Sequence, residues 1–204
     1  MRKTKEEAEV TRQKLMDAAL VVFSKKGYAT TTLDDIAREA GVTRGAIYWH
    51  FKGGKIELFN AILGERFERV GNVLKEVFSS GKTPAEMLRL MMIRLLEYIE
   101  EDADYRAVQE MLMFKTEIAP EMADGMRGKS EKIHESVRVA ESLIEKGKAS
   151  GEIRKDVNSR AAALAAMSII NGAVSIWLVD TKQFSIKEQA ASMVDVFIKG
   201  ILVH

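Results

Sequence analysis

The sequence of 204 residues has no cysteine, two prolines and three histidines. Without cysteine, the chain can form neither disulfide bonds nor thiolate metal sites. The scarcity of proline leaves room for long helices, because a proline inside a helix removes a hydrogen bond and clashes with the preceding turn. No segment shows a convincing β-strand pattern, and no internal repeat is present. We therefore predict an all-α fold with about nine helices.

One stretch, residues 161–179, lacks charge over 19 residues, which is close to the length that spans a bilayer. It is rich in alanine and also contains serine, asparagine and glycine, so its transfer into lipid is unfavourable. We expect a helix that other helices surround on most sides, and no membrane segment. The sequence start lacks the basic and apolar regions and the small-residue cleavage site of a signal peptide, so a cytoplasmic location is expected.

Charge is distributed unevenly along the chain. The net charge is +1, but residues 1–55 carry 11 lysines and arginines against 7 acidic residues, and the remainder carries 20 against 23. A basic N-terminal part beside a mildly acidic remainder is typical of a protein in which one end meets phosphate groups.

Apolar residues recur at helical spacing through most of the chain. In residues 6–26 they follow the i, i+3, i+4, i+7 pattern of one buried stripe, formed by Leu15, Ala18, Ala19, Val22 and Phe23. A similar stripe runs through residues 190–201. Outside the motif discussed next, further helices are expected at 55–78, 84–101, 104–116, 121–150, 158–179 and 186–202.

Residues 33–52, LDDIAREAGVTRGAIYWHFK, have the spacing of two short helices joined by a tight turn. Ala37 is small where the helices cross, and Gly41 permits the left-handed conformation that the turn needs. Ile47 of the second helix closes the small core between them. The outer face of the second helix is thereby left in solvent, where it can enter a major groove. The sequence predicts a helix-turn-helix motif that binds DNA.

Several residues fit the ends of the expected helices. Thr32 with Asp35 three residues later resembles a capping box, and Thr43 can cap the second helix of the motif. Gly27 suits the end of the first helix, and Pro84 suits the first turn of a later one.

The second helix of the motif carries groups that can bind DNA. Thr43 brings a hydroxyl and free amide groups to a phosphate, and Arg44 can form a bidentate contact with a guanine edge. Gly45 and Ala46 are small enough to let the backbone approach the bases. Tyr48 offers a hydroxyl for a phosphate and a ring for a thymine methyl group.

His50 and Lys55 flank this helix as further phosphate ligands. We expect Trp49 and Phe51 to pack inside the protein. The alternative, a solvated helix pair with no ligand, is less well supported because spacing, exposed chemistry and charge agree on DNA binding.

The run TTLDDIAREAGVTRGAIYWHF resembles the DNA-binding module of the TetR family of bacterial repressors, in particular the branch that controls multidrug efflux pumps. The opening RKTKEEAEVTRQKL is similar to that branch too. The resemblance, strongest over residues 5–65, implies operator contacts at Thr32, Thr43, Arg44, Gly45, Ala46, Tyr48, His50 and Lys55. Many members have one residue where Gly53 and Gly54 stand here, which puts the reach of Lys55 in question.

The resemblance also implies two domains. Residues 5–65 would bind DNA through the motif at 33–52, and residues 66–204 would form a helical core for ligand binding and dimerisation. A single motif rarely gives enough affinity, so two must be held about one major-groove turn apart on a palindromic operator in double-stranded DNA. Helices 158–179 and 186–202 can supply half of an intermolecular four-helix bundle in a homodimer. The alternative is that both helices complete the core of one chain.

The resemblance to efflux repressors implies a small hydrophobic effector. The middle of the chain is rich in methionine, whose flexible side chains suit a pocket for varied shapes but equally fill an ordinary core. By resemblance the effector would lie near Met91, Leu95, Gln109, Met113, Ile170, Asn171 and Val174. The expected mechanism is a population shift, in which the long helix from Lys55 tilts and spreads the two reading helices.

The expected function is therefore a ligand-responsive repressor that is not an enzyme and needs no cofactor. An activator or architectural DNA-binding protein without an effector is an alternative. A remote alternative is a helical metalloenzyme, suggested by the E-x-x-H pair Glu131 and His134. A di-iron site of that kind needs a second pair, which the sequence lacks, and no nucleophile-elbow, P-loop or dinucleotide motif is present.

Overall fold

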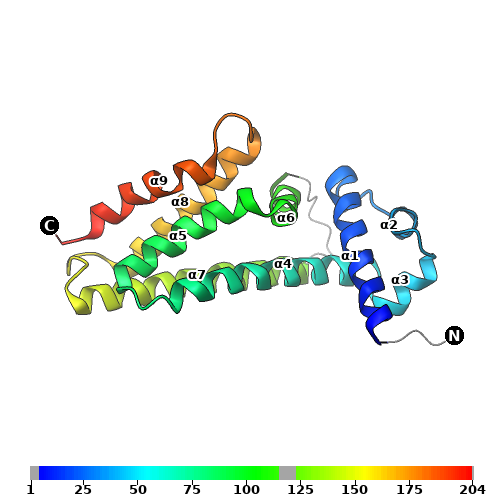
Figure 1. Cartoon of the computed structure of the whole chain (residues 1–204), viewed down its shortest axis with the longest axis horizontal. Coiled ribbons are helices and arrows are strands. Elements are labelled where there is room, and N and C mark those ends of the chain that lie inside the picture. Colours follow the sequence, from blue (N-terminus) through cyan, green and yellow to red (C-terminus); the bar gives the residue numbers. More distant parts are fainter. Residues whose placement is uncertain (1–4, 115–122, 204) are drawn as a thin grey trace. The chain divides into compact units, whose positions relative to one another are not determined.

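The computed structural model describes residues 5–114 and 123–203 of the chain. Over these residues the chain forms nine helices and no β-sheet, which confirms the predicted all-α class (Figure 1). The helices are α1 (Lys5–Lys26), α2 (Leu33–Ala40), α3 (Arg44–His50), α4 (Lys55–Phe78), α5 (Pro84–Glu101), α6 (Ala103–Phe114), α7 (Ala123–Ser150), α8 (Ser159–Val179) and α9 (Ile186–Ile201). The expected helix ends at 115–116 and 121–122 lie outside the described residues.

The chain divides into two compact units. The N-terminal unit comprises Met1–Glu68 and Asp104–Arg127, and the C-terminal unit comprises Arg69–Ala103 and Gly128–His204. Helix α4 begins in the first unit and ends in the second. Helix α6 belongs to the first, although the expected boundary at residue 65 placed it in the second domain.

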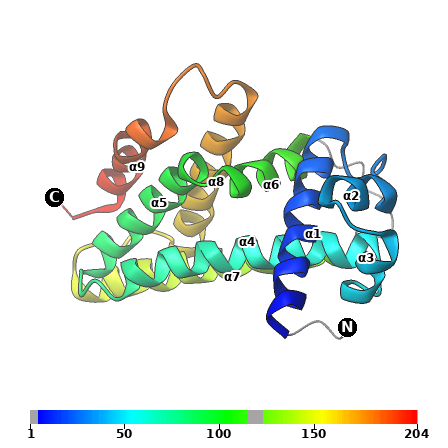
Figure 2. The ribbon, with the colours of Figure 1, turned by 45° about the vertical axis from the view of Figure 1, so that its right-hand side comes forward.

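The core of the N-terminal unit explains why α6 belongs there. Val108, Met111 and Leu112 of α6 are buried in the same apolar cluster as residues of α1 to α4. The predicted stripe on α1 is buried in this cluster as well. Figure 2 shows α1 crossing the first half of α4, and at this crossing the ring centroids of Phe23 and Phe59 lie 5.9 Å apart.

The helix-turn-helix motif has the predicted local structure. Gly41 adopts φ 63°, a left-handed conformation that costs other residues energy, and it ends α2. Thr32 and Asp35 form the predicted capping box at the start of α2. Ala37 and Ile47 are buried where α2 meets α3. The outer side of α3 is therefore fixed by the packing of its inner side.

A buried arginine joins three helices of the N-terminal unit. The side chain of Arg66 on α4 is 2% exposed. Its guanidinium lies 2.7 Å from Glu65, 3.0 Å from Asp104 on α6 and 3.5 Å from Asp17 on α1. A buried charge is tolerated only when it is paired, so these carboxylates make the position possible. The cluster fixes the start of α6 against α1 and α4.

In the C-terminal unit, α5 lies against α8 and α9. Arg89 of α5 donates from Nε to Asp195 of α9 over 2.6 Å. The carboxylate of Glu100 accepts from the Ser185 hydroxyl and the Lys187 backbone N–H, each over 2.9 Å. Because these donors lie at the first turn of α9, Glu100 supports the N-terminus of that helix.

Helix α8 is long and apolar enough to cross a membrane by length and composition, but a core helix passes the same test. Ten of its residues are buried. However, Leu164, Ile176 and Val179 on the same helix are exposed. This chain therefore covers one side of α8 and leaves apolar side chains exposed on the other, so the expectation that other helices surround α8 on most sides stays a prediction.

Candidate nucleic-acid interface

Helix α3 presents one buried side chain and a series of exposed ones. Ile47 is fully buried, whereas Arg44, Tyr48 and Trp49 are exposed, Trp49 by 66%. A helix rotates by about 100° per residue, so the position two residues after Ile47 points nearly opposite to it. Because Ile47 packs inward, the aromatic and basic side chains of α3 face solvent.

Trp49 corrects one prediction and Phe51 confirms the other. Both were expected to pack inside, and Phe51 does so, with 1% exposure and the Arg12 guanidinium 5.3 Å from its ring centroid. Trp49 is exposed and touches the ring of His50 edge-on at 4.4 Å between centroids. The sequence alone could have distinguished the buried Phe51 from the exposed Trp49. On a helix, position 51 lies about 40° from Ile47 and position 49 about 200°.

Arg44 is held by two exposed neighbours. Its Nη1 lies 3.4 Å from Asp34 Oδ2, at the start of α2, and its Nη2 lies 3.5 Å from the Tyr48 hydroxyl. The guanidinium carbon also lies 5.8 Å from the centroid of the Tyr48 ring. The hydrogen bond to Tyr48, followed by the charge of Asp34, raises the pKa of Arg44 above its usual value. The sequence reasoning gave Asp34 no role, because nothing in a spacing of ten residues marks the contact.

Thr43 occupies the N-cap position of α3, as expected, but its side chain makes no capping hydrogen bond. The prediction that its hydroxyl caps the helix is therefore wrong, and the hydroxyl stays exposed at the surface. Gly45 is exposed, and a Cβ atom placed there would lie 3.8 Å from the Thr43 hydroxyl oxygen. Ala46 is half-buried. The first turn of α3 therefore has little side-chain bulk beside Arg44.

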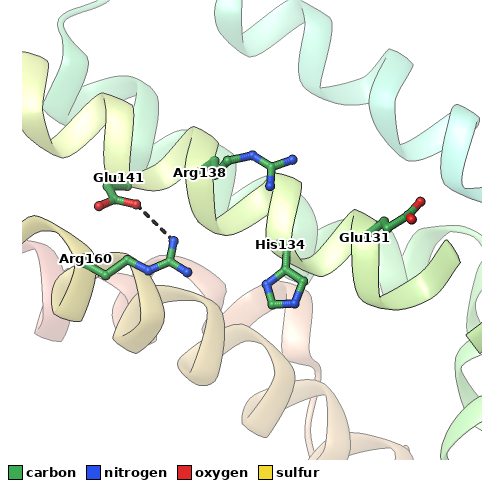
Figure 3. A pocket seen from close by; sticks show the side chains of 5 residues that line it. All are labelled: Glu131, His134, Arg138, Glu141 and Arg160. Carbon is green, nitrogen blue, oxygen red and sulfur yellow. Dashed lines mark hydrogen bonds and ion pairs between the residues drawn. The ribbon is translucent and has the colours of Figure 1, made fainter. Parts of the chain in front are cut away.

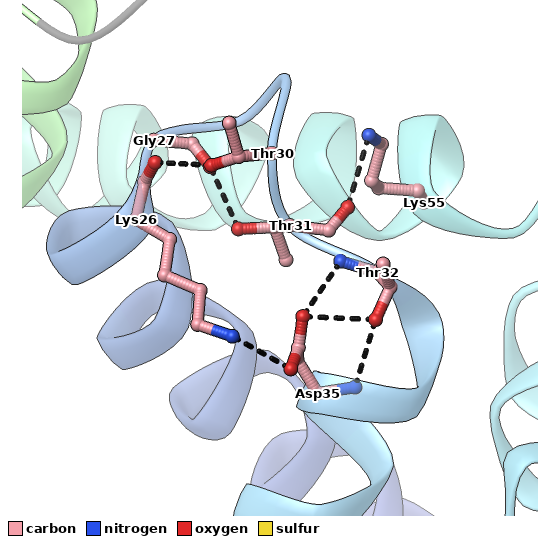
Figure 4. Close-up of polar contacts among 7 residues, drawn as sticks. All are labelled: Lys26, Gly27, Thr30, Thr31, Thr32, Asp35 and Lys55. Carbon is pink, nitrogen blue, oxygen red and sulfur yellow. Dashed lines mark hydrogen bonds and ion pairs between the residues drawn. The ribbon is translucent and has the colours of Figure 1, made fainter.

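Thr32 serves first as a structural residue. Its hydroxyl accepts from the Asp35 backbone N–H at 3.1 Å and donates to the Asp35 carboxylate at 2.8 Å (Figure 4). Lys26 approaches the same carboxylate to 2.7 Å. The hydrogen bond from Lys26, then those from the Thr32 hydroxyl and backbone N–H, hold the pKa of Asp35 well below its usual range. Thr32 stays exposed, so its predicted phosphate contact is compatible with this role.

The ammonium group of Lys55 binds backbone carbonyl groups of the protein. Its ammonium group donates to the carbonyl oxygens of Tyr28 at 3.0 Å, Thr31 at 3.1 Å and Ala29 at 3.4 Å. The nitrogen also lies 4.3 Å from the centroid of the Tyr28 ring. Figure 4 shows this side chain pointing from α4 to the loop between α1 and α2. Lys55 thus ties that loop to the first residue of α4.

The two glycines before Lys55 shape the start of α4. Gly54 has φ 68°, a conformation that favours glycine. The Gly53 N–H donates to the Glu57 carboxylate over 2.6 Å and so occupies a carboxylate in the first turn of α4. Gly53 and Gly54 therefore form an ordered turn before α4.

The predicted effector residues divide between the two units. Gln109 and Met113 lie on α6 in the N-terminal unit, and the other five lie on α5 and α8 in the C-terminal unit. Met91, Ile170 and Val174 are buried. Asn171 is exposed, and its amide donates to the Met167 carbonyl of its own helix over 2.8 Å. The effector site stays a prediction.

A groove of 490 Å³ in the C-terminal unit is open to solvent and lined by charged residues of α7 and α8 (Figure 3). Arg160 donates to Glu141 over 3.0 Å across it. Glu131 and His134 also line the groove, and their side chains point in different directions. Among the described residues, no group of three or more acids and histidines could hold a metal ion. All five lining residues carry ionisable side chains, whereas apolar and aromatic side chains predominate around a hydrophobic ligand.

Comparisons with known proteins cover almost the whole chain. Residues 15–62 match the family described as bacterial regulatory proteins, tetR family, and residues 83–202 match the C-terminal region of MAATS-type transcriptional repressors. The chain is 33% identical to the HTH-type transcriptional regulator AcrR of Shigella flexneri, over 99% of this chain and 94% of that protein.

Two solved structures are also similar. The first is NalD, the secondary repressor of the MexAB-OprM multidrug efflux pump in Pseudomonas aeruginosa, at 27% identity and a TM-score of 0.83 over 97% of this chain and 98% of NalD. The second is a SmeT–triclosan complex, at 25% identity and a TM-score of 0.81 over 95% of this chain and 92% of SmeT.

Proposed function

The chain belongs to the TetR family of bacterial regulatory proteins, and on that basis we propose that it is a dimeric repressor released from its operator by a small hydrophobic molecule. Regulators of this family bind DNA operators and small-molecule effectors, generally as dimers. The relatives that repress efflux pumps support a role in controlling efflux genes. Such a protein works in the cytoplasm, where the operator lies.

The observation that carries the proposal is the exposed surface of α3. Arg44, Tyr48 and Trp49 lie in solvent on a helix whose inner side is fixed by the buried Ile47. Thr43, Gly45, Ala46 and His50 complete the proposed contact set on this helix. Arginine at the start of a reading helix suits a guanine edge, and the hydroxyl and imidazole groups suit phosphates. We add Trp49 to the set, because its large exposed ring can pack against sugars or thymine methyl groups.

Thr32 and Lys55 differ from the residues of α3, because both also hold the protein's own backbone in place. Thr32 combines its capping role with an exposed hydroxyl that can reach a phosphate. Lys55 donates its hydrogen bonds to three carbonyl groups of the protein. We therefore assign Lys55 to the support of the interface rather than to direct contact with a phosphate.

The proposed dimer forms through α8 and α9. Both helices expose large apolar side chains, with Ile176 at 68%, Val179 at 76% and Val196 at 79%. Burying such surface between two copies is favourable and yields the symmetric pair of readers that a palindromic operator requires. The second copy would then cover the side of α8 that this chain leaves open.

The proposed effector acts through α4, which contributes residues to both compact units. An effector that binds better to one arrangement of the helices shifts the population toward it. A change in the direction of α4 would alter the spacing of the two readers and so weaken operator binding. The predicted set of Met91, Leu95, Gln109, Met113, Ile170, Asn171 and Val174 supplies the residues to mutate first. The SmeT–triclosan complex supports a hydrophobic ligand as the first probe.

The test begins with selection of bound fragments from the DNA of the source genome. The expected result is a palindromic site that wild type binds selectively, that Arg44→Ala binds at least tenfold more weakly, and that triclosan or another hydrophobic drug releases. Selective binding without release by any compound in a broad panel would favour an activator or architectural protein. Equal binding of all fragments would contradict sequence-specific regulation.

A further inference from the structure

The main reader of the proposed interface, Arg44, faces a carboxylate that the proposed function does not use. Asp34 is the second residue of α2, and its Oδ2 lies 3.4 Å from Arg44 Nη1. Both side chains are exposed, Arg44 by 55% and Asp34 by 61%. An acidic group beside a DNA reader opposes binding to phosphate, so its presence needs a reason other than affinity.

The geometry around the guanidinium supplies that reason. Asp34 holds one terminal nitrogen, and the Tyr48 hydroxyl, 3.5 Å away, lies beside the other. A guanidinium has five N–H donors, so these contacts leave donors for a base edge. They also restrain a long side chain that is otherwise free to adopt many rotamers.

The alternative partner of a free arginine is a phosphate. Phosphate contacts are available at every DNA sequence, so an arginine that swings to the nearest phosphate adds affinity without adding discrimination. The negative charge of Asp34 competes with phosphate for the guanidinium and repels phosphates near it. A guanine edge meets no such repulsion, because it offers neutral acceptors that take two N–H donors at once.

We propose that Asp34 is a specificity-determining residue of this interface, a positioning residue that acts through Arg44. It lowers binding to DNA in general and directs the guanidinium toward a guanine edge. The assignment rests on the proposed DNA-binding function and adds a residue of α2 to a contact set otherwise centred on α3. It also gives a repulsive element a role in selectivity.

The test measures two affinities for each variant, one for the selected operator and one for a scrambled duplex of equal length and composition. In Asp34→Asn we expect the affinity for scrambled DNA to rise about threefold, as for the loss of one surface charge. We expect the ratio of operator to scrambled affinity to fall about fivefold, a part of what one bidentate arginine–guanine contact provides. Asp34→Glu, which keeps the carboxylate, should retain most of the wild-type ratio.

Two controls separate positioning from simple charge removal. Glu39→Gln removes one exposed negative charge from the same helix, and Glu39 forms none of the ion pairs that the structure describes. This variant should leave the ratio unchanged. In an Arg44→Met background, Asp34→Asn should change both affinities by the same factor, because the side chain that it positions is absent.

The outcomes decide the proposal. Equal rises of both affinities in Asp34→Asn would overturn it, since Asp34 would then act as a general charge. A fall in the ratio that persists in the Arg44→Met background would overturn it too, since Asp34 would act without Arg44. If wild type selects no operator at all, the proposed function fails. If wild type is selective and Asp34→Asn is equally selective, the specificity role alone fails.

Discussion

Several charged side chains in the N-terminal unit hold chain segments together. Lys26 pairs with Asp35 across the loop between α1 and α2, and Lys55 binds three carbonyls of the same loop. Arg66 joins α1, α4 and α6 through carboxylates. The surface that meets DNA in our proposal is thus supported by charges behind it.

The contact of Lys26 with Asp35 predicts a stability change in acid. Because the pKa of Asp35 is lowered in the folded state, its contribution is complete above the unfolded pKa of about 4 and is lost progressively as the pH falls from there through the lower folded pKa. Asp35→Asn removes the ion pair, so we expect its melting temperature to lie below that of wild type near pH 6 and the difference to shrink between about pH 4 and pH 2. Thermal unfolding across this range tests the prediction. Glu39→Gln is the control, and an equal convergence in that variant would contradict the assignment.

The carbonyl contacts of Lys55 predict an unusual salt dependence in Lys55→Met. We expect weaker operator binding and a lower melting temperature, because three carbonyl groups lose their donor. The slope of log affinity against log salt should stay at the wild-type value. Loss of a phosphate ligand would instead reduce that slope by about 0.9.

Lys52→Met is the matched control for this measurement. It removes the same charge three residues earlier, from an exposed side chain. It should leave the melting temperature unchanged. A reduced slope in Lys55→Met with unchanged stability would show that Lys55 contacts phosphate after all.

At the scale of single residues, the sequence predicted local caps and turns, but it did not predict contacts between residues far apart in the chain. The capping box at Thr32 and the turn at Gly41 could be predicted because each depends on neighbours within a few positions. The contacts of Lys55 could not, since its carbonyl partners lie 24 to 27 positions away. The same holds for Asp34, which meets Arg44 only after α2 and α3 have packed.

At the scale of helices, the bounds followed from the sequence, but the partners did not. Periodicity shows that one face of α6 is apolar, and its described bounds lie close to the expected ones. It does not show which core receives that face. The sequence order suggested the C-terminal domain, whereas Val108, Met111 and Leu112 enter the core of the N-terminal unit.

The placement of α6 predicts a distant effect of Met111→Ala. Met111 is fully buried, and truncating a buried methionine costs about 2–5 kcal/mol. We expect amide hydrogens in α1 to α3 to exchange faster in this variant and those in α9 to keep their wild-type rates. Met113→Ala, on the same helix at an exposed position, should leave both groups of amides unchanged. Slower or unaltered exchange in α1 to α3 would contradict the packing of α6 in this core.

At the scale of the whole molecule, α8 and α9 expose large apolar side chains, among them Ile176, Val179 and Val196. In the proposed dimer a second copy covers them, and the symmetric pair brings two short readers to one palindromic operator. The sequence indicates these two helices as candidates for that interface. It could not predict which of their residues remain exposed, because the helical pattern alone does not divide apolar positions between a chain's own core and a second copy.

This surface predicts that Ile176→Asp disrupts the dimer. A carboxylate at an apolar interface loses its hydration without gaining a partner. We expect sedimentation at micromolar concentration to report a dimer for wild type and a monomer for the variant, with operator affinity at least a hundredfold lower. Val10→Asp, at an exposed apolar position on α1, should remain dimeric. A dimeric Ile176→Asp variant would place the interface elsewhere.

The membership of α6 in the N-terminal core also has a consequence for synthesis. Translation delivers residues 1–68 first, yet three side chains of their core arrive only with residues 108–112. Until then the nascent chain exposes the apolar surface that α6 will cover, while α5 of the other unit has already emerged. The N-terminal unit therefore cannot complete its core before residue 112 has been made, and a ribosome paused between residues 68 and 108 would hold the DNA-binding unit in an incomplete, chaperone-accessible state.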